Sequence, residues 1–196
     1  YRIATANLFP YWTIGNHTVV LRLFWHFFDM LAFETAAIVK RIVRIEKPDV
    51  VMTHNLMGIG FLIPRALRSL GVRHIHTVHD VQLSVPSGLL FFGQRIPFLI
   101  TIAFSWYERV VRFLIGSSHV VIAPSQWLLD FYADRGFFPQ SKKIKLENPV
   151  TIKGSIGQNI VKGKKTEHSL RLLFVGQLEK HKGILFLIEA IKKFQI

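Results

Sequence analysis

The sequence predicts an α/β fold in which a parallel sheet is covered by helices, and two observations predict it. Short apolar runs such as residues 49–53 (DVVMT) are typical of strands that are buried on both faces of a parallel sheet. Between these runs lie amphipathic segments, in which apolar residues such as Ile38, Ile42 and Ile45 recur at helical spacing. Alternation of this kind is characteristic of a Rossmann-like domain.

This first Rossmann-like domain is expected over residues 1–150 and to be incomplete at its start. Helices are predicted at residues 16–28, 29–47, 58–70, 97–116 and 126–135, and strands at 49–53, 73–78, 119–123 and 143–146. Pro48 should end the second helix, Gly71 should supply the positive φ that follows a helix, and Ser125 should cap the helix that begins at Gln126.

The composition changes after residue 150. Residues 151–169 are rich in glycine, lysine and polar residues, which predicts a linker or loop. A buried strand is predicted at residues 170–175 (LRLLFV) and an amphipathic helix at 184–194, and together they would begin a second Rossmann-like domain over 170–196. Because the chain opens on Tyr1 rather than methionine, we expect a piece of a longer protein, truncated at both ends.

The composition limits the classes of protein that fit. Lysine and arginine total 25 against 12 aspartates and glutamates, which predicts an anionic partner: nucleic acid, an acidic membrane surface or a phosphorylated small molecule. The absence of cysteine excludes disulfides and thiolate metal sites. The longest uncharged apolar run in the middle of the chain, Ile96 to Tyr107, has twelve residues. Since a bilayer span needs about 20, no transmembrane helix is predicted.

The segment at residues 74–80 (HIHTVHD) allows three interpretations: a metal cluster, a catalytic constellation, or the end of a buried strand. Side chains alternate along a strand, so His74 and His76 share one face and His79 does not, which makes a three-histidine metal site awkward. We therefore expect His74 and His76 to be partly buried and hydrogen-bonded. His79 follows the strand, at the edge where open parallel sheets bind ligands.

The same rule selects His54 and Asn55 after the preceding strand, with a polar strand cap as the equally weighted alternative. Further on, Gly176 follows an apolar run, and Lys182 and Gly183 precede a helix whose free amides suit a phosphate. This segment could hold a diphosphate, or its lysine could simply be solvated. It is not a P-loop, and no Gly-x-Gly-x-x-Gly run supports a dinucleotide oxidoreductase.

Five segments in order carry a family resemblance: PDVVMTHN, HIHTVHD, SSHVVIAPSQWLLD, KIKLENPV and LRLLFVGQLEKHKGILFLIEAI. From about Asn7 to the last residue, the chain resembles family 4 of the retaining glycosyltransferases, which have the GT-B fold of two facing Rossmann-like domains. The resemblance implies an acceptor-side, subfamily 4-like N-terminal domain at residues 1–150 and the start of the donor-side, group 1 C-terminal domain at 170–196.

The resemblance implies an activity for the whole protein. It would be a hexosyltransferase-type enzyme that transfers a sugar from a nucleotide-sugar donor to a sugar or lipid-linked acceptor, with retention at the anomeric carbon. The product would be a polysaccharide, glycan or glycolipid. The resemblance implies no cofactor and no essential metal. It also implies that this piece alone is inactive, because the glycine-rich amino-terminal loop and the paired glutamates that contact the donor in this family lie outside it.

The resemblance also implies roles for single residues. His79 would be catalytic and lie near the donor sugar, while Gly176, Gln177 and Lys182 would bind the donor. Lys182 would neutralise the diphosphate leaving group, a use of fixed charge against developing charge. The family commonly has arginine where Gln177 stands, and glutamine brings no charge. His54, Asn55 and Asp80 are the candidates for the acceptor side.

The expected location is cytoplasmic and peripheral on the cytoplasmic face of an anionic membrane. Aromatic residues such as Phe24, Phe27 and Phe28 are expected mainly in the core, with some forming an apolar rim that docks on a bilayer. The alternative hypothesis is a non-catalytic basic α/β module that binds anionic lipid or nucleic acid. No recognised RNA-binding motif is present, so no nucleic-acid partner is expected.

Overall fold

The computed structural model describes residues 1–3, 7–88, 90, 98–149, 172–176, 178 and 182–193. The chain divides into two compact units, Tyr1–Val150 and Thr151–Ile196. The predicted linker at residues 151–169 lies outside the described residues.

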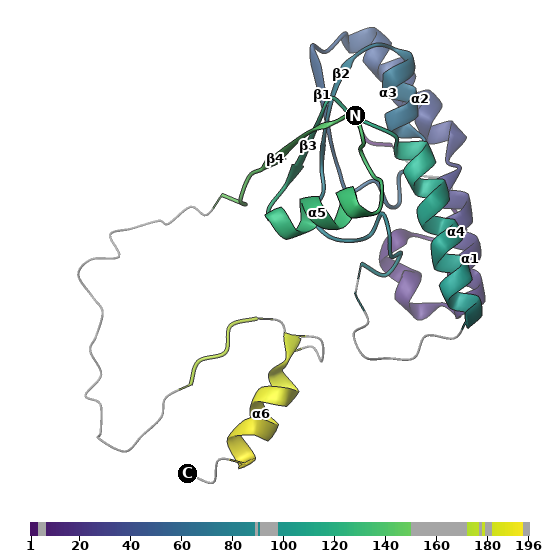
Figure 1. The fold of residues 1–196 in the computed structure, drawn as a ribbon. Helices are drawn as coiled ribbons and strands as arrows, with labels where there is room; N and C mark the ends of the chain where they lie inside the picture. Colours follow the sequence, from purple (N-terminus) through teal and green to yellow (C-terminus); the bar gives the residue numbers. More distant parts are fainter. Residues whose placement is uncertain are drawn as a thin grey trace. The chain divides into compact units, whose positions relative to one another are not determined.

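The first unit is built on a four-stranded parallel sheet (Figure 1). Its strands follow one another across the sheet in chain order: β1 (Val50–His54), β2 (Arg73–Thr77), β3 (Val120–Ala123) and β4 (Lys142–Lys145). Parallel neighbours need a crossover between them. The helices α3 (Ile63–Ser69), α4 (Phe98–Ile115) and α5 (Gln126–Asp134) supply these crossovers. The predicted α/β fold with a Rossmann-like parallel sheet is therefore confirmed.

Three further elements precede the sheet: the 3₁₀ helix η1 (Tyr11–Asn16), α1 (Val19–Met30) and α2 (Phe33–Glu46). The break between the two long helices falls at Leu31 and Ala32, slightly after the predicted one at Asp29. Lys47 has a left-handed φ of 48° and ends α2 directly before Pro48, as predicted. In Figure 1, α2 lies against α3, and α3 lies against α4.

The helix predicted at residues 58–70 is shorter in the structure and begins only at Ile63. Gly58 and Gly60 have φ of 90° and 102°, which an α-helix does not allow. A Cβ on Gly60 would lie 2.6 Å from the Cβ of Ala32, so the glycine lets this turn approach the junction of α1 and α2. Gly71, by contrast, has the predicted positive φ of 68°.

The strand predicted as buried at residues 49–53 is β1, and it is not buried. Val50, Met52 and His54 are exposed, while Val51 and Thr53 are half-buried. In the described part of the chain, β1 pairs only with β2 and forms one edge of the sheet. An edge strand is covered less well than a central one, which explains why the apolar pattern overestimates its burial.

The core lies between the sheet and its helices. α5 begins as predicted, since the Ser125 hydroxyl accepts a hydrogen bond from the Leu128 amide at 3.2 Å. The core residues buried most completely are Trp25, Leu56, Phe61, Leu67, Val111, Ile115, Val121, Ala123, Phe137 and Phe138. They come from α1, the loop after β1, α3, α4, β3 and the segment after α5, so the elements of this unit share one core.

The second unit contains α6 (Ile184–Lys193), which begins after Gly183 with its φ of 80°. This helix agrees with the one predicted at residues 184–194. Leu172 to Val175 do not form a strand, contrary to the prediction. A strand needs a hydrogen-bonded neighbour, and the described residues of this unit hold no second strand.

Candidate functional site

Two histidines meet at the carboxyl end of the sheet. His54 is the last residue of β1, and His79 lies just after β2. Their rings are stacked with centroids 5.3 Å apart, and a hydrogen bond joins His54 Nδ1 and His79 Nε2 at 3.0 Å. Both side chains are exposed. The strand-end argument therefore selected two residues that the fold brings together at the expected edge.

The other two histidines of the HIHTVHD segment point into the protein. His74 and His76 are each only 1% exposed. The Thr53 hydroxyl on β1 lies 2.7 Å from His74 Nε2 and 2.7 Å from His76 Nδ1, so it bridges both rings. The predicted hydrogen bonding of these two histidines is confirmed, and their burial is more complete than the partial burial predicted.

The hydrogen bonds indicate how the two buried rings carry their protons. The buried Nδ1 of His74 has no hydrogen-bond partner. An unpaired buried N–H is rarer than an unpaired acceptor, so we assign the proton to Nε2, which then donates to Thr53. The Thr53 hydroxyl is left to donate to His76 Nδ1. Both rings are neutral in this arrangement.

The pKa values of these rings agree with that assignment. Burial lowers the pKa of His74 to about 4, helped by the nearby charge of Arg68. Burial also lowers the pKa of His76 to about 3, and the neighbouring histidines act in the same direction. A cation is costly in a buried site. His74 and His76 on β2 are thus neutral, buried and structural, whereas His79 of the same segment is exposed and pairs with His54.

The loop after β1 is held by a buried acid. Asn55 has a positive φ of 21°, and its side chain accepts a hydrogen bond from the Met57 amide at 3.3 Å. Both carboxyl oxygens of Asp29 on α1 lie 3.0 Å from the Gly58 amide. Burial raises the pKa of Asp29 to about 7, although the Gly58 hydrogen bond acts against the rise. The Asn55 side chain therefore stabilises the turn that follows β1, and Asp29 on α1 holds the loop through the Gly58 amide.

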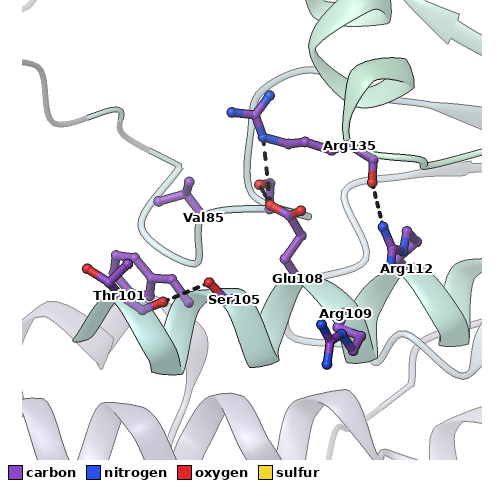
Figure 2. A pocket seen from close by; sticks show the side chains of 9 residues that line it. Val85, Thr101, Ser105, Glu108, Arg109, Arg112 and Arg135 are labelled. Atoms are coloured by element: carbon purple, nitrogen blue, oxygen red, sulfur yellow. Dashed lines mark hydrogen bonds and ion pairs between the residues drawn. The ribbon is translucent and has the colours of Figure 1, made fainter. Parts of the chain in front are cut away.

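A pocket of about 340 Å³ lies beside α4 (Figure 2). It is lined by Ser84, Val85, Thr101, Phe104, Ser105, Glu108, Arg109, Arg112 and Arg135. Three of these side chains are guanidiniums and one is a carboxylate, so the lining carries a net positive charge. The sequence patterns did not single out this pocket.

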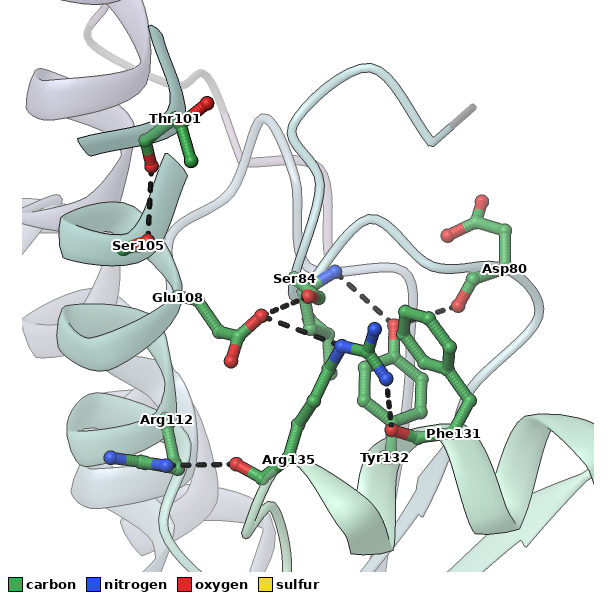
Figure 3. A network of polar contacts seen from close by, with 10 residues as sticks. Asp80, Ser84, Thr101, Ser105, Glu108, Arg112, Phe131, Tyr132 and Arg135 are labelled. Atoms are coloured by element: carbon green, nitrogen blue, oxygen red, sulfur yellow. Dashed lines mark hydrogen bonds and ion pairs between the residues drawn. The ribbon is translucent and has the colours of Figure 1, made fainter. Parts of the chain in front are cut away.

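One wall of this pocket belongs to a polar network that holds the loop after β2 (Figure 3). Arg135 Nε lies 3.7 Å from a Glu108 carboxylate oxygen, and the Ser84 hydroxyl donates to the same oxygen. The Tyr132 hydroxyl donates to the Asp80 carbonyl at 2.7 Å and accepts from the Leu83 amide at 3.3 Å. Residues 80–84, which follow His79, are thereby fixed to α4 and α5.

Asp80 is thus held in position by the hydrogen bond from Tyr132 to its backbone carbonyl. Its side chain accepts a hydrogen bond from the Gln82 amide at 2.8 Å, which closes a local turn. The structure joins His54 directly to His79, and it places Asn55 and Asp80 next to them in sequence. No contact between the side chains of Asn55 and Asp80 forms among the described residues.

The donor-side candidates lie in the second unit. Gly176 follows Leu172–Val175, and a Cβ on it would lie 3.3 Å from the Phe174 ring. Lys182 is exposed and stands just before α6, where its charge can add to the positive end of the helix dipole. Gln177 lies outside the described residues. That Gly176, Gln177 and Lys182 bind the donor, with His79 near its sugar, stays a prediction.

The described residues contain neither a metal-binding cluster nor a membrane-spanning helix. No three histidine, aspartate or glutamate side chains in this part of the chain are grouped so that they could hold a metal ion. In the same residues, no helix combines the length and the apolar character that a membrane span requires.

Several residues of the site were not predicted. Asp29 had a signal, because it is a lone acid in the aromatic run WHFFDM, and such an acid faces either solvent or a buried partner. Thr53 had a weaker one, since it precedes His54 on a strand. Glu108, Tyr132 and Arg135 had none, because their contacts to the loop after β2 depend on how α4 and α5 pack against it.

The comparisons with known proteins agree with this architecture. Residues 6–150 match the model of Glycosyltransferase Family 4. Over 175 residues the chain is 27% identical to an uncharacterised 42.6 kDa protein in the cps region of Klebsiella pneumoniae. That match covers 88% of the chain but 45% of the relative, so the chain spans about half of the relative's length.

Proposed function

Because the chain belongs to glycosyltransferase family 4, we propose that the whole protein transfers a hexosyl group from a nucleotide-sugar to a sugar or lipid-linked acceptor. The anomeric configuration is retained, and the product is a polysaccharide, glycan or glycolipid. The cps region that contains the relative is consistent with such a product. The first unit supplies the acceptor side and the second begins the donor side of a GT-B enzyme. The described chain alone is expected to be inactive.

The observation that carries this proposal is the His54–His79 pair at the carboxyl edge of a parallel sheet. Ligands of open parallel sheets bind at this edge. The hydrogen bond between the two rings requires one donor nitrogen and one acceptor nitrogen, so His54 holds the His79 ring in a fixed orientation. We assign His79 to the reacting centre, where it contacts the sugar being transferred.

The donor diphosphate is assigned to the second unit. Gly176 leaves the backbone open to the ligand, Gln177 donates a hydrogen bond, and Lys182 neutralises the charge that develops on the leaving diphosphate. In the proposed reaction, the bond from the anomeric carbon to the diphosphate oxygen breaks as the bond to the acceptor oxygen forms. The leaving oxygen takes the acceptor's proton. This scheme uses no cofactor and no essential metal, and no general base among the acids of the chain.

His54, Asn55 and Asp80 are assigned to the acceptor side. His54 ends β1, Asn55 follows it, and Asp80 follows β2, so all three lie at the edge of the sheet from which an acceptor hydroxyl would approach. The excess of basic residues fits a phosphorylated donor and an anionic membrane surface. We therefore propose a cytoplasmic enzyme that works at the cytoplasmic face of the membrane.

The test is binding and turnover with the whole protein. Calorimetric titration with a panel of nucleoside diphosphates should find one that binds, and the matching nucleotide-sugars should be consumed in the presence of an acceptor extract. NMR of the product should show the anomeric configuration of the donor. If no nucleoside diphosphate binds, the proposal is wrong, and a non-catalytic basic module becomes the better description.

A further inference from the structure

Helix α4 carries a basic pocket and, beside it, a row of exposed apolar side chains. The pocket contains Arg109 and Arg112. The row consists of Phe98, Ile102, Trp106 and Phe113, which are between 50% and 77% exposed. We call this row the α4 stripe. Exposed apolar groups of this size commonly mark a surface that is covered by a partner or a membrane.

Helix geometry places the two surfaces side by side. With 3.6 residues per turn, the four residues of the α4 stripe fall within an arc of about 80°. Thr101, Ser105 and Arg112, which line the pocket, fall on the adjoining arc, and Arg109 falls inside the stripe itself. An elongated molecule with an anionic head and an apolar tail could therefore contact both surfaces of one helix at once.

The charges of the pocket favour an anion. Among the described residues of the lining, Glu108 is the one carboxylate, and it is paired with the guanidinium of Arg135 and accepts a hydrogen bond from Ser84. Arg112 donates one hydrogen bond, to the Arg135 carbonyl at 2.8 Å. Within the described part of the chain, neither Arg109 nor Arg112 forms an ion pair, and Arg109 forms no hydrogen bond. Two guanidiniums are thus available to the planar, two-point contacts that they make with phosphate oxygens.

We propose that this face of α4 binds the phosphate or diphosphate group of a membrane lipid, with the phosphate at Arg109 and Arg112 and the lipid chain along the α4 stripe. Arg109 lies within the stripe, and its long apolar stem can lie along the lipid chain while the guanidinium reaches the phosphate. This site specifies the membrane contact of the proposed function. The test of this lipid site does not measure sugar transfer. The lipid site can therefore be wrong while the proposed transferase activity is right, or the transferase activity can be wrong while the lipid site is right.

The experiment is flotation of the whole protein with vesicles of phosphatidylcholine alone and of phosphatidylcholine mixed with phosphatidic acid. Binding should require phosphatidic acid and should weaken about fivefold in Arg109→Gln and again in Arg112→Gln, the fold-change that corresponds to about 1 kcal/mol per basic residue. The matched control is the pair Arg41→Gln and Arg44→Gln on α2, which has the same spacing and also lies on an exposed face. These two variants should bind as the wild type does.

The apolar contact is tested by Trp106→Ser, with Trp127→Ser on α5 as its control because both indoles are about half exposed. Trp106→Ser should weaken vesicle binding, and Trp127→Ser should not. Equal losses in the α2 and α4 arginine variants would overturn the proposal in favour of non-specific charge. Competition by inorganic diphosphate with no effect of Trp106→Ser would also overturn it, because the pocket would then bind a free phosphate.

Arg112→Gln removes the hydrogen bond to the Arg135 carbonyl and could therefore lower stability. Arg109→Gln tests the site without this complication, because the Arg109 guanidinium makes no hydrogen bond among the described residues. Its unfolding midpoint should equal that of the wild type. Unchanged vesicle binding in a folded Arg109→Gln variant would contradict the site.

Discussion

His54 Nδ1 and His79 Nε2 lie 3.0 Å apart, so the exposed ends of two neighbouring strands are joined through their side chains. Replacing His79 by alanine removes the group that we assign to the reacting centre. The turnover number of the whole protein should fall about a hundredfold or more, in line with the loss of one acid–base or polar group from an active site. Steady-state kinetics with the donor that binds would measure it.

Folding provides the control for this variant. His79 is exposed and packs against no core residue, so the urea midpoint of His79→Ala should match that of the wild type. His54→Ala should have a smaller effect on turnover, about tenfold, because in this proposal His54 acts by holding the His79 ring. Unchanged turnover in folded His79→Ala would contradict the assignment of the catalytic residue.

Lys182 should act on the leaving group rather than on folding. Lys182→Ala should lower the turnover number about a hundredfold, since charge on the diphosphate develops in the transition state. Lys182→Arg should restore part of the activity. Lys192→Ala and Lys193→Ala, at the other end of α6, are matched controls because they remove the same charge from exposed positions. If all three alanine variants lose activity equally, the lysine has no special role.

The buried histidines should make stability depend on pH. The folded pKa of His74, about 4, and that of His76, about 3, lie below the ordinary value of 6.5. The unfolded chain therefore binds more protons as the pH falls below 6.5, and stability is lost in that direction. For each ring the loss between pH 7 and pH 5 is roughly 2 kcal/mol.

A difference measurement isolates this effect from other titrating groups. The free energy of unfolding of the wild type minus that of His74→Gln should be larger at pH 7 than at pH 5, because glutamine does not titrate. A His74→Gln difference that stays constant over this range would show that folding does not lower the pKa of His74, and it would contradict the neutral, buried ring assigned here.

Much of the fold could be predicted because periodicity and turn residues report local structure directly. Pro48, Gly71 and Ser125 mark the ends of elements that the structure confirms. Burial was harder to predict than element type. The apolar run of β1 resembles a central strand, but it lies at the edge of the described sheet. The strand predicted at residues 170–175 needs a hydrogen-bonded partner that no local pattern can supply.

The candidate site divides in the same way. The position of His54 and His79 at strand ends follows from the parallel sheet alone, since every such strand ends at the same edge. The contacts that support them depend on register and helix packing. Thr53 reaches both buried rings because it is paired with His76 across the two strands. Tyr132 reaches the Asp80 carbonyl from α5, 52 residues further along the chain.

Asp29 should oppose the histidines in the pH dependence of stability. Burial raises its folded pKa to about 7 from an ordinary value of 3.8. As the pH rises from about 4 to 7, the unfolded chain loses this proton first, so the carboxyl removes stability. Asp29→Asn keeps an acceptor for the Gly58 amide without a titrating group. Its free energy of unfolding relative to the wild type should increase by roughly 2 to 4 kcal/mol between pH 4 and pH 8.

Urea unfolding at a series of pH values measures this difference. If the advantage of Asp29→Asn over the wild type shrinks as the pH rises, the carboxylate is stabilised by folding and its assigned pKa is wrong.

Tyr132→Phe should weaken the loop that carries the chain away from His79. The substitution keeps the buried ring and removes only the hydroxyl that donates to the Asp80 carbonyl and accepts from the Leu83 amide. The buried Leu83 amide and the part-buried Asp80 carbonyl lose their partner, which should lower the free energy of unfolding by about 1 to 3 kcal/mol. Turnover should fall as well, because residues 80–83 follow directly on His79.

Tyr1→Phe is the matched control: its hydroxyl donates to Glu46 at 2.5 Å on the exposed surface, where water can replace the bond. Both variants are compared by urea unfolding and by turnover with the nucleotide-sugar. Equal stability and equal turnover in the two would mean that the hydroxyl of Tyr132 does not hold this loop.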